Sequence, residues 1–133
     1  MNAAGIGRSG MDVAMMRLTA SASNIANAQS TGPVPGGAAD DGTGKVYRPL
    51  RVETSASPGG GVSGQTVRDD AGYRLTYDPA SMKADAKGMI AEPDVDVADE
   101  LVEQIAAKLA FEANLKVVST ANEMERRSIE LWG

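Results

Sequence analysis

Four carboxylates stand close together in the sequence, at Asp94, Asp96, Asp99 and Glu100, and they are the residues best placed for chemistry. They could bind a cation, but a calcium-binding loop spreads its ligands over about twelve residues with a glycine near the centre. The segment after Asp94 has no such glycine. Acid–base catalysis by paired carboxylates would need a pocket with apolar walls, which the neighbouring residues do not supply. We therefore interpret the acids as the start of a helix, where Asp96 caps free N–H groups and the others oppose the helix dipole.

A second motif, Gly44-Lys45, matches only the end of a phosphate-binding loop. That loop needs a glycine five residues before Gly44 and a Ser or Thr after the lysine, but the sequence has Ala39 and Val46 at these positions. The chain also has no His and no Cys, which excludes a zinc site, a thiol nucleophile and a histidine base. We expect a protein that is not an enzyme, and we assign no catalytic, cofactor-binding or metal-binding residue.

Large core residues are scarce in this chain of 133 residues, where aromatic residues make up only 4%. Such a composition gives a thin core and favours burial against partners. The net charge of −5 argues against nucleic acid and against an anionic membrane surface as partners. No apolar run approaches the ~20 residues that span a bilayer, and the start of the chain lacks the apolar region of a secretory signal. We expect no direct membrane insertion and no cleaved signal peptide.

The elements that must position any interface are two amphipathic helices at the two ends of the chain. The first is predicted over residues 3–28, where apolar residues follow a heptad spacing. This N-terminal seam consists of Met11, Met15, Leu18, Ala22 and Ile25. Small neighbours such as Ala14 and Ser21 would let another helix approach closely. Periodicity leaves two interpretations open: an ordinary core helix, which it favours, and an intermolecular seam.

The second helix is predicted over residues 97–131 and carries two apolar stripes. The first stripe is Ala98, Val102, Ile105, Leu109, Ala113, Val117, Ala121 and Met124, and the second is Leu101, Phe111, Leu115, Val118 and Ile129. A helix of this length is roughly 50 Å long. Burying each large apolar side chain contributes about 1.5–3 kcal/mol. The free-energy cost of leaving several of them exposed to solvent would therefore exceed the usual folding stability of about 5–15 kcal/mol. The helix therefore needs the N-terminal helix, other copies or both, and the alternative is a long hairpin monomer.

The middle of the chain is rich in glycine and is predicted to form loops and a small β region. Strand candidates are residues 46–52, weakened to an edge or bulged strand by Pro49, residues 62–67, and residues 73–77, which show the clearest alternation. Residues 81–91 lack clear periodicity. The region has too few apolar residues to fold firmly alone.

The string Ser23-Asn24-Ile25-Ala26-Asn27-Ala28-Gln29-Ser30-Thr31-Gly32 resembles the N-terminal signature of bacterial flagellar axial proteins. Its asparagines stand near a helix end, where Asn tolerates a left-handed turn and can bond local backbone. Four further strings resemble, in order and spacing, the FlgC family of proximal rod proteins: Tyr77-Asp78-Pro79, residues 84–88, residues 93–97 and residues 111–114. Tyr47-Arg48 is similar to another motif of the family, while the rest of residues 33–72 matches poorly.

This resemblance implies a structural subunit of the flagellar basal-body rod, which spans the periplasm. It implies export by the flagellar type III apparatus without signal cleavage, and assembly with copies of the chain and with other rod proteins to transmit torque and line the export channel. The implied fold is mainly α, with long N- and C-terminal helices that pair as an antiparallel coiled-coil hairpin around a small irregular β and loop region. We expect one structural unit made of residues 1–32, 33–96 and 97–133.

The expected assembly interface joins both helices and the signature. It consists of Met11, Met15, Leu18, Ala22, Asn24, Ile25, Asn27, Val102, Ile105, Leu109, Phe111, Leu115, Val117 and Met124. Two alternatives stay open. A rod-like paralogue or accessory axial protein would differ in residues 33–72, so a typical rod segment placed there would restore rod function. A cytoplasmic coiled-coil adaptor would form a stable dimer and stay in the cytoplasm.

Overall fold

The structure is a computed structural model that describes residues 2–132 and, within them, contains two helices and four strands. The helices are α1 (Ala3–Ala26) and α2 (Val97–Trp132). The strands are β1 (Leu50–Ala56), β2 (Val62–Arg68), β3 (Tyr73–Tyr77) and β4 (Met89–Pro93). The two predicted helices are confirmed, with ends that differ by at most two residues, and so is a mainly α fold with a small β region. The predicted limits at residues 1 and 133 lie outside the described residues.

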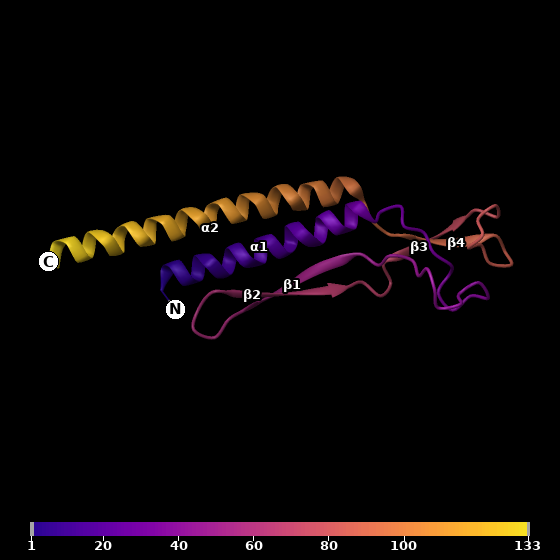
Figure 1. Cartoon of the computed structure of the whole chain (residues 1–133), viewed down its shortest axis with the longest axis horizontal. Coiled ribbons are helices and arrows are strands. Elements are labelled where there is room, and N and C mark those ends of the chain that lie inside the picture. Colours follow the sequence, from indigo (N-terminus) through magenta and orange to yellow (C-terminus); the bar gives the residue numbers. More distant parts are fainter. Residues whose placement is uncertain (1, 133) are drawn as a thin grey trace.

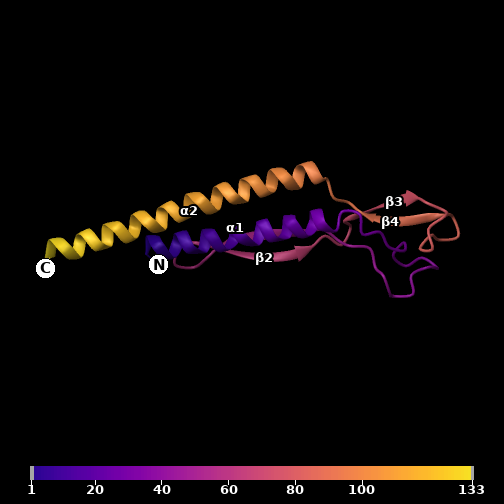
Figure 2. The ribbon, with the colours of Figure 1, turned by 45° about the horizontal axis from the view of Figure 1, so that its top comes forward.

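The two helices lie side by side and run in opposite directions, so that both ends of the chain lie at the same end of the molecule (Figure 1). The β1–β2 hairpin lies along α1 on the side away from α2, and the β3–β4 hairpin extends beyond the other end of the helices. Figure 2 shows that the C-terminal part of α2 continues past the beginning of α1. Helix α1 is therefore the central element, covered on two sides, whereas α2 is covered on one.

Helix α1 begins and ends at asparagines. The side chain of Asn2 caps it by accepting a hydrogen bond of 2.9 Å from the N–H of Gly5. At the other end, Asn27 donates both its backbone N–H and its side-chain Nδ2 to the carbonyl of Ser23. The expected bonding to local backbone is confirmed at Asn27 but is wrong at Asn24, whose side chain bonds Leu50 and other distant residues. The expected left-handed turn is also wrong, because Asn27 has φ −107° and ψ 9°. The side-chain bond closes the helix without a change of handedness.

Helix α2 begins at the predicted cap. The carboxylate of Asp96 accepts a hydrogen bond of 2.8 Å from the N–H of Ala98 and a longer one from Asp99. Asp99 and Glu100 occupy the first turn, where negative charge opposes the helix dipole. No described helix is long and apolar enough to cross a membrane.

The strands form two separate antiparallel pairs, β1 with β2 and β3 with β4. The strand expected at residues 46–52 begins only at Leu50, because Pro49 has no N–H to donate to a partner strand, and it continues to Ala56. The strands predicted at 62–67 and 73–77 are confirmed. Strand β4 was not predicted. Its residues Ile90, Ala91 and Pro93 are all buried, so they show no alternation of apolar and polar residues.

The core is thin, as the composition predicts, and is dominated by alanine. Its buried apolar residues are Ala4, Val13, Ala14, Ala20, Val46, Ile90, Ala91 and Ala107. On the hairpin side of α1, the Ser9 hydroxyl accepts a hydrogen bond of 3.1 Å from the N–H of Val62. A methyl group placed on Gly64 would lie only 3.2 Å from Val13 and 3.1 Å from Met16. Strand β2 therefore approaches α1 closely because it has no side chain at Gly64.

The turn between β3 and β4 gives a prediction about pH. One carboxylate oxygen of Asp85 accepts hydrogen bonds from the N–H groups of Met89 and Lys87, and these bonds, first that of Met89, hold the pKa of Asp85 below its ordinary value of 3.8. A carboxyl group whose pKa is lower in the folded state stabilises the fold above its ordinary pKa, and this contribution is lost as the pH falls through the lowered value. We expect an NMR titration of Asp85 to have a midpoint below 3.8, with the amide signals of Lys87 and Met89 shifting together. The same amides should not follow this titration in Asp85→Asn, and a midpoint at or above the ordinary value would contradict the bonding.

Candidate assembly surface

Helix α1 meets α2 through its smallest residues. A methyl group placed on Gly7 would lie 2.8 Å from a methyl of Val118, and one placed on Gly10 would lie 2.5 Å from the amide oxygen of Asn114. One turn further on, Ala14 is buried, and Ala107 is fully buried on the α2 side. Because there are no long side chains between them, the two helices approach closely along this contact.

We expect the change Gly7→Ala to destabilise the subunit by about 1 kcal/mol. Alanine favours a helix over glycine by roughly 0.5–1 kcal/mol, but forcing an extra methyl into a filled contact costs about 1–3 kcal/mol. Urea denaturation of Gly7→Ala measures the balance. The double variant Gly7→Ala/Val118→Ala should be at least as stable as Gly7→Ala alone, because the methyl that the new Cβ meets is gone. A stabilised Gly7→Ala would show that the helices are not in close contact.

Near the end of α1, the side chain of Asn24 joins three parts of the chain. Its Nδ2 donates to the carbonyl of Leu50 (2.9 Å) and to the carboxylate of Glu100 (2.6 Å). Its Oδ1 accepts from the N–H of Leu50 (2.7 Å) and from the hydroxyl of Tyr47 (2.9 Å). Since the single hydroxyl proton of Tyr47 goes to Asn24, the contact of 3.0 Å between this hydroxyl and Ser23 must be donated by Ser23. The amide is 2% exposed and uses its full bonding capacity.

Two further polar contacts fix α1 against α2. The hydroxyl of Ser21, itself buried, donates a hydrogen bond of 2.8 Å to the carbonyl of Glu100. The guanidinium of Arg17 meets Glu103 through two hydrogen bonds, of 2.5 and 2.9 Å. This bonding and the charge of Glu103 raise the pKa of Arg17 above its ordinary value. A bidentate pair is directional, so it fixes the register of the two helices as well as their separation.

The expected interface residues fall into three groups in the structure, which are buried, half-buried and exposed. Asn24 is buried inside the subunit, while Met11, Leu18, Ile25, Asn27 and Phe111 are half-buried. The remaining residues are exposed, and they are Met15, Ala22, Val102, Ile105, Leu109, Leu115, Val117 and Met124. In α2 the exposed fraction reaches 65% at Val102 and 62% at Ile105. Most of the expected residues on α2 are thus free for a partner.

Parts of both helices meet at one apolar hollow on the outside of the helix pair. Met15 and Leu18 of α1 line it together with Phe111 and Leu115 of α2, and its volume is about 260 Å³. Its other lining residues are Ala14, Ala107, Lys108 and Glu112. The hollow therefore brings together four of the expected interface residues. It could bind an apolar side chain of a neighbouring subunit.

Sequence reasoning missed several residues that build this surface. Gly7 was not singled out, the close helix contact at Gly10 was not foreseen, and neither was the role of Tyr47 in bonding Asn24. One signal could have found the helix contact: Gly7, Ala14 and Ser21 repeat every seven residues, which marks a continuous small-residue face on a helix. No such local pattern in the sequence indicates that Asn24 bonds Leu50 and Glu100.

Comparison with known proteins gives consistent results. Residues 86–131 match the family described as flagellar basal body rod FlgEFG protein C-terminal. The chain is 36% identical to the flagellar basal-body rod protein FlgC of Yersinia enterocolitica, over 98% of this chain and 96% of that protein. It is 33% identical to the protein of the same name from Aquifex aeolicus, again over 98% and 96%, and 35% identical to that of Agrobacterium fabrum, over 95% and 90%. These alignments thus extend across the middle of the chain.

Proposed function

The chain belongs to the FlgC family of flagellar basal-body rod proteins, and we propose that it enters the rod through the paired helices α1 and α2. Family membership makes it a structural subunit of the basal body and not an enzyme. The proposal has two parts. The first is which surface of the chain is covered in the rod, and the second is how the paired helices act there.

The exposed apolar face of α2 carries the proposal. Of the 36 residues in α2, only Ala107 is buried. The exposed large apolar residues of the helix are Val97, Leu101, Val102, Ile105, Leu109, Leu115, Val117, Met124, Ile129, Leu131 and Trp132. So many exposed large apolar side chains on one helix mark it as an interaction surface. Copies of the same chain and other rod proteins are the partners that would cover it.

We propose that the helix pair acts as an antiparallel coiled coil in the assembled rod. Close contact at Gly7 and Gly10, the heptad repeat of small residues and the Arg17–Glu103 pair support this arrangement. Asn24 would couple the coiled coil to the β region through Leu50. Torque applied to the outer β region would then reach the helices through fixed hydrogen bonds, and α1 and α2 would line the export channel. The chain works as one structural unit in this proposal.

The route to the rod is part of the same proposal. Residues 2–20 of the chain are already part of α1 or its cap, and they contact α2 in the folded subunit. We propose that the flagellar type III export apparatus carries the chain out without cleavage, since removing this segment would remove the contacts of Gly7, Gly10 and Arg17 with α2.

A complementation experiment tests the proposal. In a strain that lacks this gene, the tagged full chain should restore swimming and should copurify with basal bodies at its full mass. Retention in the cytoplasm as a free dimer would favour the adaptor alternative. Normal rods in the deletion strain, with no second gene of the family present, would refute a rod role.

A further inference from the structure

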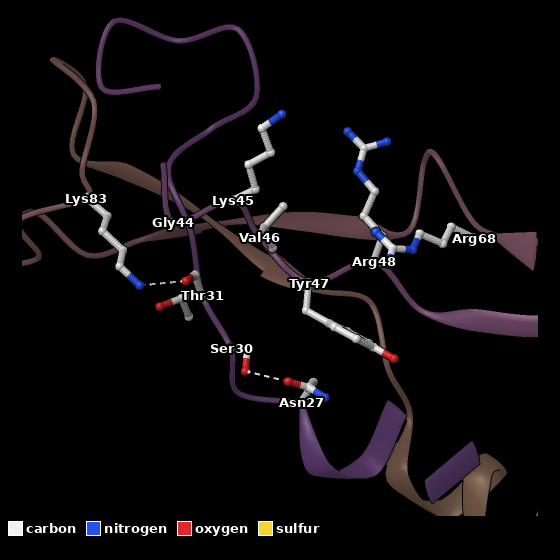
Figure 3. Close-up of a pocket in the computed structure, with 10 residues that line it drawn as sticks. All are labelled: Asn27, Ser30, Thr31, Gly44, Lys45, Val46, Tyr47, Arg48, Arg68 and Lys83. Carbon is white, nitrogen blue, oxygen red and sulfur yellow. Dashed lines mark hydrogen bonds between the residues drawn. The ribbon is translucent and has the colours of Figure 1, made fainter. Parts of the chain in front are cut away.

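A hollow rimmed by positive side chains lies beyond the C-terminal end of α1, well away from the helix contact. Figure 3 shows Lys45, Arg48, Arg68 and Lys83 around it, contributed by three separate segments of the chain. Its volume is about 460 Å³, and its other lining residues are Asn27, Ser30, Thr31, Gly44, Val46 and Tyr47. None of the lining residues is acidic, although the whole chain carries a net charge of −5.

The four cations are only partly neutralised by the subunit itself. Arg48 pairs with Asp70 at 3.1 Å. The pKa of Asp40 is held below its ordinary value by the N–H groups of its own loop and, more weakly, by the charge of Lys45. Lys83 donates a hydrogen bond of 2.7 Å to the carbonyl of Thr31, as Figure 3 shows. Within residues 2–132, Arg68 forms no ion pair.

The opposite charge is concentrated in another part of the same chain. Between Lys87 and Lys108 the sequence contains six acidic residues and no basic one. Three of the six are used internally, because Glu92 pairs with Arg74, Glu103 pairs with Arg17, and Glu100 bonds Asn24. The other three are exposed and form no ion pair among the described residues, and they are Asp94, Asp96 and Asp99. We call them the acidic ridge.

We infer that the basic hollow of one subunit receives the acidic ridge of a second copy of this chain. We take the contact to be heterologous, with each subunit giving its ridge to one neighbour and its hollow to another, and repeating such a contact builds a ring or an open helical array. Complementary charge of this kind sets the register between neighbours and steers their approach. The inference rests on the proposed rod function, since it supplies one of the contacts between successive subunits.

The first experiment is cross-linking in assembled rods. The chain has no cysteine, so single cysteines can be placed beside the charges without removing them, at Ser30→Cys in the hollow and Ala98→Cys in the ridge. When the two variants are made together in one cell, a flexible thiol cross-linker should yield a covalent dimer in purified basal bodies. The matched pair Ser30→Cys with Thr120→Cys, which lies far along α2, should yield none. Rods that contain both variants but no specific dimer would overturn the inference.

The second experiment exchanges the charges. Lys45→Glu/Arg68→Glu should reduce rod assembly at low ionic strength by about tenfold, because like charges then face each other. Adding Asp94→Lys/Asp99→Lys to the same chain should restore assembly, with Asp96 left in place as the helix cap. The same charge change at Glu123→Lys/Glu125→Lys should not restore it.

The results separate this inference from the proposed function. A chain that is found in basal bodies, but whose defect in the hollow is not restored by the exchanged ridge, would show that the hollow receives another partner and would overturn the inference alone. A chain that is absent from basal bodies in every form, including the unchanged one, would overturn the rod function itself.

Discussion

The variant Asn24→Ala is expected to lose about 3 kcal/mol of folding stability, a large part of the total for a chain of this size. The substitution removes four hydrogen bonds made by one buried amide. A typical bond contributes about 0.5–1.5 kcal/mol net, and a buried partner left without one costs about 1–3 kcal/mol. Leu50 loses partners for both its N–H and its carbonyl, so the beginning of β1 should separate from α1.

Urea denaturation of the purified subunit gives the total effect, and hydrogen exchange at the Leu50 amide gives the local one. We expect that amide to exchange faster in Asn24→Ala by more than the global loss of stability requires. The matched control is Asn27→Ala, which removes the other asparagine of the signature but only local contacts with Ser23 and Ser30. It should cost less than about 1 kcal/mol. Equal losses in the two variants would show that the bonding around Asn24 is not coupled across the chain.

The coupling itself can be measured with Tyr47. The variant Tyr47→Phe removes one donor to Asn24 and leaves the ring in place. If the hydroxyl acts through Asn24, the double variant Asn24→Ala/Tyr47→Phe should be hardly less stable than Asn24→Ala alone. Additive losses would place the role of Tyr47 elsewhere, for example in its contact with Ser23.

The helices could be predicted from the sequence because their signals are local. Asp96 stands directly before an unbroken apolar-periodic segment, and the observed helix begins at the next residue and ends one residue beyond the prediction. The two strands bounded by turns were also found. Strand β4 was not, because Ile90, Ala91 and Pro93 are all buried, and a strand buried on both faces shows no alternation. Its two edges pair with β3 and, at Ala91, with Gly32.

The face by which α1 meets α2 was harder to predict, because large apolar residues dominate a periodicity argument. The closest contact is made by Gly7, Gly10 and Ala14. These residues matter because they have no side chain or only a methyl group, which lets the helices approach each other. The position of Asn24 could not be foreseen for another reason. Its main partner is Leu50, which lies 26 residues away in the chain and becomes a neighbour only when the loop between them folds back.

The variant Ile105→Gln/Leu109→Gln is expected to fold normally and to fail in the rod. Both side chains lie on the exposed face of α2, at 62% and 60% exposure, and glutamine is nearly as good a helix former as leucine. The stability of the isolated subunit should therefore change by less than about 0.5 kcal/mol. In the proposed rod both residues are covered, and losing two large apolar contacts should weaken association by about 2–4 kcal/mol, which is roughly 30- to 1000-fold.

Two measurements on the same variant separate these effects. Circular dichroism with urea titration should match the unchanged subunit, while the complemented deletion strain should not swim and its basal bodies should lack the chain. The matched control Glu123→Gln/Arg127→Gln replaces two exposed polar residues of α2 with the same residue type and should swim. If Ile105→Gln/Leu109→Gln also swims, this part of α2 stays in solvent within the rod. The helix pair would then join its neighbours through other exposed apolar residues, such as those of the hollow between Met15 and Leu115, where apolar residues of α1 and α2 meet.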